Sequence, residues 1–419
     1  MFGLKNYLKK FLPAQFLSSY HFFLSWLGAF VYRYPSSKLI VIGVTGSKGK
    51  TTVTELISKI FEEAGQKTAL LNSIQIKVGA SSEENTMRMS MPGRFFIQKF
   101  LSDAAQEGCA VAVLEMTSEG VKQSRHRFIE LNALVFLNLE PEHIESHGSY
   151  QAYADAKFEL ARALARSRKR PRIIAANADD KESGRYLTLS VEHALPFSLQ
   201  AQNPYEAGAH GGYFTFDGAK ISIKLPGEFS LRNALAAATV ARASGIPLDT
   251  ISRALEKISL IPGRAEYVDE GQNFSLVVDY AHTPASLTAL YETYKGQQKI
   301  CVLGSTGGGR DMWKRPVMGQ IAEKYCDVVI LTDEDPYDED PQQIVQDVAH
   351  GMAKKPEIVM DRRAAIRRGI ELARQNSVVL ITGKGTNHEI CGPKGTVTPW
   401  SDVQVAREEL KAFLKKAVS

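Results

Sequence analysis

The sequence has few cysteines and no two of them close together. Its four cysteines are spread along 419 residues, and none forms a C-x-x-C pair. A zinc ribbon needs closely spaced thiolates, and a disulfide framework needs many cysteines in a short chain. We therefore expect neither here, and thiols this sparse suit a reducing cytoplasm.

Features typical of several other protein classes are also missing. The formal net charge of +5 is mild for this length, so we expect no nucleic-acid partner. No internal repeat or low-complexity run is visible, and the composition is that of an ordinary globular protein. The length is enough for two or three domains with separate cores.

The N-terminal segment of residues 1–38 is apolar and aromatic. Residues 11–32 are rich in Phe, Leu, Trp and Tyr, with basic residues on both sides. No small-residue cleavage site follows cleanly, so we do not expect a signal peptide. The stretch has the length of a spanning helix but contains proline, glutamine, histidine and serines. It predicts a helix packed on the body of the protein. A helix lying on a membrane surface, or one crossing the membrane, is the alternative.

The most informative segment, residues 39–52, is a buried-type strand followed by a glycine-rich turn and the start of a helix. Glycines let backbone N–H groups approach phosphate oxygens, and a helix N-terminus adds partial positive charge. Lys50 can neutralise β/γ phosphates, and the Thr51 hydroxyl can bind Mg²⁺. The general P-loop pattern has a glycine where Val44 stands, so the match is imperfect. The order of the parts still predicts an ATP-binding loop.

Strand-like and helix-like segments alternate after this loop. This alternation predicts a parallel sheet covered by helices on both faces, with ligands at the carboxyl ends of the strands. Residues 79–91 are expected to form a polar loop. The strands are expected at 39–44, 67–71, 110–115 and 131–138, and the helices at 51–64, 95–107 and 150–165.

The pattern changes near Arg264. Residues 212–225 predict hairpin-like strands and residues 230–244 an alanine-rich helix; a second α/β pattern then begins. We predict an α/β protein with a short apolar helical N-terminus (residues 1–38), a P-loop central domain on a parallel sheet (39–263) and a C-terminal Rossmann-like α/β domain (264–419). The strands expected in the last domain are 275–280, 299–303, 327–331 and 378–382.

Residues able to bind metal follow two further strands. Glu115 ends the strand 110–115, where a carboxylate can hold Mg²⁺ opposite the phosphate loop. His143 lies in a dense run of carboxylates and imidazoles and could bind a second divalent ion. The alternatives are a solvated carboxylate and a polar loop histidine that bind nothing. Lys157, on the next predicted helix, would by itself be interpreted as a surface lysine.

Seven motifs occur in the order found in the Mur ligase family, which the chain resembles from about residue 39 to its C-terminus. The last of them is most similar to the branch that adds the third amino acid to a UDP-N-acetylmuramoyl-dipeptide. The motifs are Gly46-Ser47-Lys48-Gly49-Lys50-Thr51-Thr52, Glu115-Met116-Thr117-Ser118, Asn138-Leu139-x-x-Glu142-His143-x-x-x-His147-Gly148, Ala156-Lys157, Arg232-Asn233-Ala234-Leu235-Ala236-Ala237, Pro262-Gly263-Arg264-x-Glu266 and Asp279-Tyr280-Ala281-His282-Thr283-Pro284.

The resemblance implies an ATP-dependent amide-bond ligase of peptidoglycan precursor synthesis with ATP and Mg²⁺ as cofactors. A muramoyl-peptide acceptor would be phosphorylated to an acyl phosphate, which the amine of an incoming amino acid then attacks. Such an enzyme would work in the cytoplasm, and the inner face of the membrane is a further option if residues 11–32 make a peripheral membrane contact.

The resemblance also implies roles for individual residues. The ATP phosphates would be held by Gly46, Ser47, Lys48, Gly49, Lys50, Thr51 and Thr52, and the rest of the nucleotide by Asn233, Arg264, Asp279 and His282. One Mg²⁺ would be held by Thr51 and Glu115, and a second by His143 and a carbamylated Lys157. The catalytic group would be Lys50, Glu115, His143 and Lys157. The substrates would contact Asn85, Thr86, Ser118, Asp335 and Glu389.

The chain departs from the family pattern at its N-terminus and at the metal motif. Family members have a full N-terminal domain that holds the uridine part of the substrate, whereas this chain has only about 38 residues there. Either UDP is held differently, or the acceptor is lipid-linked, which would suit the apolar N-terminus. Glu142-His143 replaces the usual Asp-His and keeps the charge.

The expected amino-acid pocket departs as well. Tyr337 stands where diaminopimelate-adding relatives have an arginine on the substrate carboxylate, and the residues around it are acidic. We expect an acidic pocket rim without an arginine, which favours lysine or another diamine over diaminopimelate. A merely solvated acidic loop is the alternative. The segment 383–389 is similar to the family's Gly-Lys-Gly-His-Glu with two residues inserted, which weakens the assignment of Glu389.

Three other interpretations remain. A folylpolyglutamate-type ligase shares the motif 279–284 with this chain. An amidating subunit that works with a glutamine amidotransferase partner also lacks the UDP domain, but it usually carries a four-cysteine zinc ribbon. A nucleotide-binding scaffold without turnover would not need the full set of residues Lys50, Thr51, Glu115, His143 and Lys157.

Overall fold

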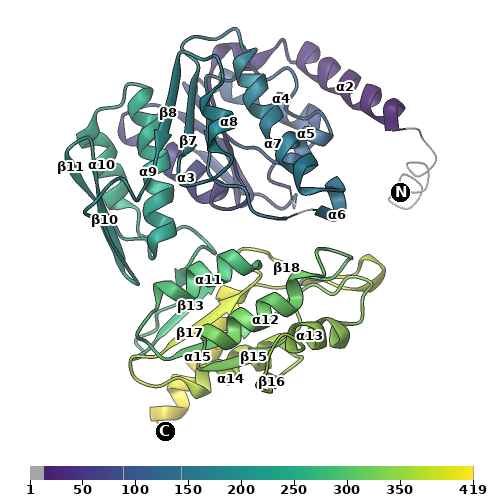
Figure 1. Cartoon of the computed structure of the whole chain (residues 1–419), viewed down its shortest axis with the longest axis vertical. Coiled ribbons are helices and arrows are strands. Elements are labelled where there is room, and N and C mark those ends of the chain that lie inside the picture. The colour runs from purple at the N-terminus through teal and green to yellow at the C-terminus, as the bar shows by residue number, and fades with distance from the viewer. Residues whose placement is uncertain (1–13, 88, 143, 419) are drawn as a thin grey trace.

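Two parallel-rich sheets organise the chain, one in the upper and one in the lower half of the view in Figure 1. The computed structural model describes residues 14–87, 89–142 and 144–418. The strand order is β4-β3-β2-β5-β1-β6-β7-β8 in the first sheet and β12-β13-β17-β14-β15-β16 in the second. The expected α/β fold class is confirmed. The division of the chain at residue 264 stays a prediction.

The first sheet carries the phosphate-loop sequence on its central strand. Its strands are β1 (Ile40–Thr45), β2 (Thr68–Leu71), β3 (Gln75–Val78), β4 (Ser81–Glu84), β5 (Val111–Glu115), β6 (Ala133–Phe136), β7 (Ile173–Asn177) and β8 (His193–Phe197). All neighbours are parallel except β2–β3 and β3–β4. The expected loop at 79–91 is therefore wrong for β4. All four β4 side chains are exposed, so the segment lacks the apolar alternation that predicts a strand.

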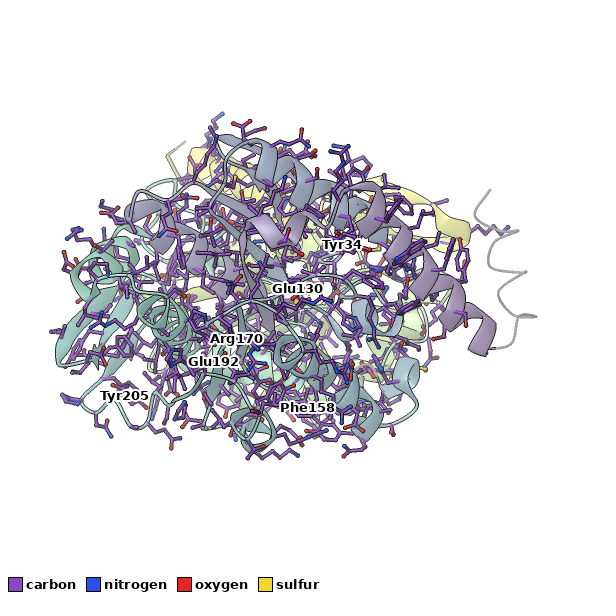
Figure 2. All side chains as sticks on the ribbon, turned by 90° about the horizontal axis from the view of Figure 1, so that it is seen from above. Tyr34, Glu130, Phe158, Arg170, Glu192 and Tyr205 are labelled. Atoms are coloured by element: carbon purple, nitrogen blue, oxygen red, sulfur yellow. A yellow bond between two sulfur atoms is a disulfide. The ribbon has the colours of Figure 1, made fainter. Side chains whose placement is uncertain are left out.

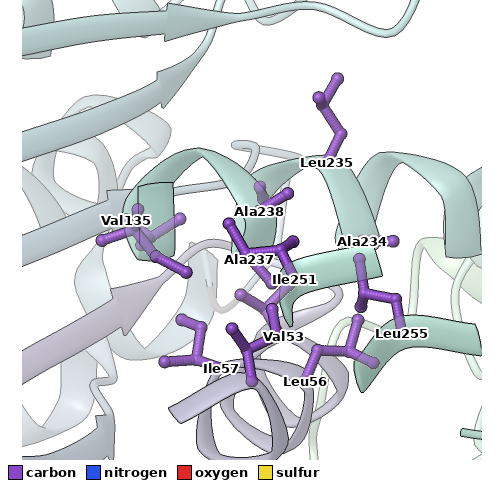
Figure 3. Close-up of a cluster of buried hydrophobic side chains, with 14 of the residues drawn as sticks. Val53, Leu56, Ile57, Val135, Ala234, Leu235, Ala237, Ala238, Ile251 and Leu255 are labelled. Carbon is purple, nitrogen blue, oxygen red and sulfur yellow. The ribbon is translucent and has the colours of Figure 1, made fainter. Parts of the chain in front are cut away.

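Helices cover both faces of the first sheet, as expected. Val135 and Leu134 are neighbours on β6 and point to opposite faces, which gives two separate cores. Figure 3 shows one of them, where Val53 and Ile57 of α3 meet Ala237 of α9. The small alanines of α9 let this helix pack closely on α3. The helices are α3 (Lys50–Glu63), α4 (Arg94–Gln106), α5 (Ser118–Lys122), α6 (Ile144–His147), α7 (Tyr150–Ala165), α8 (Ser183–Leu187), α9 (Glu228–Ala243) and α10 (Leu248–Lys257).

The N-terminal helix α2 (Ala14–Val31) packs on α4, which confirms the expected packed helix. Gly28 lies against the start of α4, since a Cβ at this position would lie 3.5 Å from the Phe95 Cα, which is ordinary van der Waals contact. The buried Ser25 hydroxyl donates to the Ser124 carbonyl at 2.7 Å. Among the described residues, no helix is long and apolar enough to cross a membrane.

The second sheet follows a small three-stranded sheet of β9 (Glu206–Gly208), β10 (Gly211–Phe216) and β11 (Ala219–Ile223). It is parallel except at its β12–β13 edge. Its strands are β12 (Glu266–Tyr267), β13 (Ser275–Asp279), β14 (Lys299–Leu303), β15 (Val328–Leu331), β16 (Glu357–Ile358) and β17 (Val378–Thr382), and a separate pair is β18 (Glu389–Cys391) and β19 (Val397–Pro399). Its helices are α11 (Pro284–Thr293), α12 (Lys314–Tyr325), α13 (Pro341–Ala349), α14 (Arg362–Leu372) and α15 (Asp402–Val418).

The described residues contain one disulfide, which the sparse cysteines and the expected reducing environment did not predict. Cys301 of β14 and Cys326, directly after α12, are bonded. They are 25 residues apart in the sequence. The β14–α12–β15 crossover returns the chain to the neighbouring parallel strand and so brings the two thiols together. Cys109 and Cys391 are buried and do not take part in this disulfide.

The burial of His126 should make the stability of the folded chain depend on pH. Its ring is 3% exposed, neither nitrogen has a partner among the described residues, and burial lowers its pKa from 6.5 to about 4. Between pH 6.5 and 4 the unfolded chain therefore binds one proton more than the folded chain, so stability falls by about 3 kcal/mol as the pH drops. We expect His126→Leu to remove most of this loss in urea unfolding at both pH values.

The matched control for His126 is His193→Leu, because His193 is exposed. This control should keep the full acid dependence of the parent chain. An unchanged dependence in His126→Leu would mean that other groups cause the acid sensitivity.

Candidate functional site

The phosphate-loop sequence forms a tight turn between β1 and α3. The Ser47 N–H donates to the Asn138 carbonyl at 3.0 Å, and the Lys48 N–H donates to the Asn138 side chain at 2.8 Å. Gly49 has φ +83°, and a Cβ there would lie 2.4 Å from Oδ1 of Asn233. The α9 side chain expected to contact the nucleotide is therefore packed directly against the loop.

Lys50 is positioned by the loop that it follows. Its Nζ donates to the carbonyls of Gly46 at 3.0 Å and Ser47 at 2.9 Å. Burial lowers its pKa, and the negative charges of Glu115 and Glu142 oppose this effect. A poorly hydrated ammonium group at a helix N-terminus can bind a phosphate strongly.

Glu115 meets the start of α3, as its place at the end of β5 predicts. Its carboxylate accepts from the Thr51 hydroxyl at 2.9 Å and from the Ser73 N–H at 3.1 Å. The Ser73 hydroxyl lies 2.8 Å from the Thr51 hydroxyl. The sequence analysis missed Ser73, although its place just beyond β2, at the carboxyl edge of the sheet, could have indicated it.

This group of oxygens fits Mg²⁺ but does not enclose it. Mg²⁺ is commonly held by one or two carboxylates together with substrate phosphates and water. Glu115 supplies a carboxylate and Thr51 a hydroxyl, both facing the phosphate loop. Among the described residues, no three or more His, Cys, Asp or Glu side chains form a metal-binding group. His143 lies outside the described residues.

Lys157 is buried, so its interpretation as a surface lysine is wrong. It is 2% exposed, and its Nζ donates to the Gly46 carbonyl at 2.6 Å. Burial, together with the nearby Lys50, holds its pKa well below 10.5. An uncharged amine is a nucleophile, which carbamylation by CO₂ requires.

Two residues from the second part of the chain reach the loop. An N–H of Arg264 donates to the Thr51 hydroxyl at 3.4 Å, and the guanidinium lies 4.6 Å from the Tyr280 ring centre. Nδ1 of His282 lies 2.6 Å from the Tyr280 carbonyl, which can only accept, so Nδ1 carries the proton. Nε2 of His282 is then the acceptor for Lys48, 3.4 Å away. Burial, together with the Lys48 charge, holds the pKa of His282 well below 6.5.

Lys48 and Asp279 have structural partners of their own. Lys48 forms an ion pair with Glu142 at 2.5 Å, so the altered metal motif is connected to the loop. The buried Asp279 carboxylate accepts from the N–H groups of Ala265 at 2.7 Å and Ala281 at 2.6 Å, and burial raises its pKa. In this arrangement Asp279 holds the turns that carry Arg264 and His282.

The residues expected to contact substrate are spread over both parts of the chain. Asn85 is buried and donates to the backbone carbonyls of Asn72, just after β2, and of Met89; Thr86 is exposed, and Ser118 is buried at the start of α5. Asp335 accepts from Lys384 Nζ and from the Cys391 N–H, both at 2.8 Å. Glu389 is partly buried on β18. Asp335 is therefore already paired with a cation.

Part of the acidic segment near Tyr337 is buried, and an arginine lies beside Tyr337. Glu334 is 2% exposed and Asp335 6% exposed, so both are buried. Arg310, from the glycine-rich loop after β14, lies 5.2 Å from the Tyr337 ring centre, and its Nη2 is 3.4 Å from the Tyr337 hydroxyl. The expected rim without an arginine is wrong, because a loop distant in sequence supplies one.

Two family models match this chain. The family model described as Mur ligase middle domain matches residues 44–241, and the one described as Mur ligase, glutamate ligase domain matches residues 263–385. A UDP-N-acetylmuramoyl-L-alanyl-D-glutamate–2,6-diaminopimelate ligase of Syntrophomonas wolfei is 36% identical over 409 residues, covering 94% of this chain and 82% of that protein.

Solved structures give the same result. A structure with that same ligase name is 27% identical, with a TM-score of 0.61 over 92% of this chain and 82% of the other. Mycobacterium tuberculosis folylpolyglutamate synthase, complexed with ADP and AMPPCP, has a TM-score of 0.69 at 16% identity over 86% of this chain and 92% of the other. At that identity the likeness shows the fold alone.

A pair of glycine substitutions separates backbone strain from the contact with Asn233. Gly49 and Gly65 have φ of +83° and +77°, so alanine is strained at both, by about 1–2 kcal/mol. A Cβ meets Asn233 at Gly49 and only open space at Gly65. We expect Gly49→Ala to weaken ATP binding at least tenfold in calorimetry. Gly65→Ala should lower the stability without weakening ATP binding. Equal ATP affinities of the two variants would contradict the proposed contact of the loop with the nucleotide.

Proposed function

Because the chain belongs to the Mur ligase family, we propose that it is an ATP-dependent ligase of peptidoglycan precursor synthesis. It adds an amino acid to a UDP-N-acetylmuramoyl-peptide or related muramoyl acceptor. The observation that carries the proposal is the meeting of the phosphate loop with Glu115, Lys157 and Arg264, which come from three other segments of the chain.

The phosphate loop binds ATP in this proposal. The loop N–H groups and Lys50 hold the β/γ phosphates, and Asn233 lines the nucleotide side of the loop. Arg264 and His282 approach the same loop from the second part of the chain, where they stabilise the negative charge that develops during transfer. Their approach also limits water, which would hydrolyse an acyl phosphate.

Thr51 and Glu115 would hold a Mg²⁺ ion, and a carbamylated Lys157 would help to hold a second one. Bound Mg²⁺ neutralises charge on the transferring phosphoryl group. Carbamylation replaces the amine of Lys157 by an anionic oxygen ligand, which gives a buried lysine beside Gly46 a function. His143 completes this second site in the proposal.

The acceptor carboxylate attacks the γ-phosphorus of ATP, and ADP leaves. The amine of the incoming amino acid then attacks the carbonyl carbon of the acyl phosphate, and inorganic phosphate leaves with the C–O bond electrons. Asn85, Thr86 and Ser118 would contact the acceptor. Asp335 and Glu389 would contact the amino acid, and the ion pair of Asp335 with Lys384 would make Asp335 a positioning residue there.

Arg310 suggests which amino acid enters. It stands beside Tyr337, the position at which diaminopimelate-adding relatives carry their own arginine. A guanidinium binds a carboxylate in two-point fashion, so Arg310 favours an amino acid with a second carboxylate. We therefore propose diaminopimelate in preference to lysine.

As part of this proposal, the enzyme works in the cytoplasm at the inner face of the membrane. Residues 11–32 would make the peripheral contact. The part of this segment that the structure describes forms α2, whose exposed aromatic side chains include Phe23 and Phe30. Such a contact would bring the enzyme close to a lipid-linked acceptor.

Phosphate release from ATP tests the proposed ligase directly. We expect release only when UDP-N-acetylmuramoyl-dipeptide and one amino acid are both present, with diaminopimelate active and lysine at least tenfold weaker, because only the former offers Arg310 a distal carboxylate. Mass spectrometry of the product gives the added mass. A strong preference for lysine would overturn the role of Arg310, and turnover of a folate-type acceptor in place of the muramoyl one would overturn the function.

Substitution of Lys157 should change both the turnover number and the pH dependence of stability. We expect Lys157→Met to lower kcat at least a hundredfold. Because the pKa of Lys157 is lowered on folding, the unfolded chain binds more protons below pH 10.5, and the buried amine costs stability most at low pH. The Tm of the variant should therefore exceed that of the parent at pH 6, by a margin that shrinks as the pH rises.

Lys169→Met is the matched control for Lys157. Burial lowers the pKa of Lys169 to about 8, but its Nζ donates to the Asn132 side chain at 3.0 Å and to the Leu39 carbonyl, at the opposite end of β1 from the phosphate loop. This variant should keep kcat. Similar losses of kcat in both variants would show that Lys157 acts through stability alone.

A further inference from the structure

The outer face of α2 carries a continuous row of exposed aromatic rings, which we call the aromatic stripe: Phe23, Trp26 and Phe30. Their spacing of three and four residues places them on one side of the helix. They are 52%, 38% and 59% exposed. The ring centres lie 5.8 Å apart between Phe23 and Trp26 and 5.6 Å apart between Trp26 and Phe30. A folded protein seldom leaves such a row in water unless it serves contact.

Positive charge adjoins the aromatic stripe, and negative charge is missing from the same segment. Arg33 and Lys38 are exposed just beyond the end of α2. They line a hollow of about 430 Å³ together with Tyr32 and with Ser102 and Gln106 of α4. No Asp or Glu precedes Glu55 in the chain. The hollow is large enough for a phosphate-bearing headgroup and has two cations at its rim.

Tyr34, the residue after Arg33, lies on the same face of the molecule as Arg170 (Figure 2). Arg170 is exposed and forms an ion pair with Glu192 at 3.1 Å, and Arg168, two residues earlier, is exposed as well.

We propose that the aromatic stripe and the hollow at Arg33 and Lys38 dock onto a membrane that contains anionic phospholipids. The rings enter at headgroup level, where aromatic side chains are favoured, and the two cations meet lipid phosphates. The inference rests on the proposed location at the membrane. Lipid binding is measured without turnover, however, so its failure would leave the proposed ligase reaction untouched.

The charges favour a membrane over a second copy of the chain as the occupant. A twofold dimer through this face would place the patch against itself. Arg33 and Lys38 would then lie in an interface with a copy of their own segment, which has no acidic residue in its first 54 positions to pair with them. An anionic lipid surface satisfies both the rings and the cations.

Docking would also orient the candidate acceptor side of the site. The Ser25 hydroxyl of α2 donates to Ser124 at 2.7 Å, and Nε of Arg94 donates to the Gln123 carbonyl at 2.8 Å. Both carbonyls follow α5, which begins with Ser118 directly beyond Glu115 and its strand. The helix is thus held rigidly on the element that carries a proposed acceptor contact.

Flotation with vesicles tests this surface on the full chain. The probes are vesicles of phosphatidylcholine alone and of phosphatidylcholine mixed with phosphatidylglycerol. We expect at least tenfold stronger binding to the anionic vesicles, weakened by salt. Binding to the anionic vesicles should fall at least tenfold in the triple variant Phe23→Ser, Trp26→Ser and Phe30→Ser. It should also fall in the double variant Arg33→Glu and Lys38→Glu, at least fivefold for each reversed charge.

Matched controls come from the second part of the chain. Ile358→Ser and Lys355→Glu change an exposed apolar side chain and an exposed cation far from α2, and both should bind as the parent does. Equal Tm values would show that the α2 variants fold. Absence of binding to the anionic vesicles, or binding that survives the triple substitution, overturns the proposal. So does a dimer in light scattering that only the triple substitution breaks.

Discussion

The hydrogen bond between the Thr51 hydroxyl and the Glu115 carboxylate is the interaction on which the rest of the site depends. It joins the start of α3 to the end of β5, and Arg264 reaches the same hydroxyl from the second part of the chain. Two parallel strands end side by side here because β1 and β5 are in register from Ile40 to Val44. The parallel sheet thus brings a phosphate loop and a carboxylate together at its carboxyl edge.

Burial determines the electrostatic character of the site around this bond. Lys50, Lys157 and His282 all have pKa values lowered chiefly by loss of hydration. In such a setting, dipoles and charges act on a phosphate more strongly than they would in water. A lysine that gives up its proton easily is also a nucleophile, so the same burial that costs stability makes carbamylation of Lys157 chemically reasonable.

The N-terminal helix connects the site to the outside of the molecule. The helix α2 packs through Ser25 and exposes Phe23, Trp26 and Phe30. The side chains that it buries, at Ser25, Gly28 and Ala29, are small, whereas those that it exposes include large aromatic rings. That distribution is the reverse of a helix stabilised by its own apolar face, and it points to an external apolar contact.

The sequence by itself determined the α/β class, most strands and helices, and the phosphate loop, because hydrophobic periodicity, glycines and Lys-Thr-Thr act within a few residues of each other. Only the tertiary structure decided that Lys157 is buried, that Ser73 joins Thr51, that Arg310 stands beside Tyr337 and that Cys301 bonds Cys326. These contacts join residues that are distant in sequence. No local pattern encodes them, because strand order and crossover connections alone decide which loops meet.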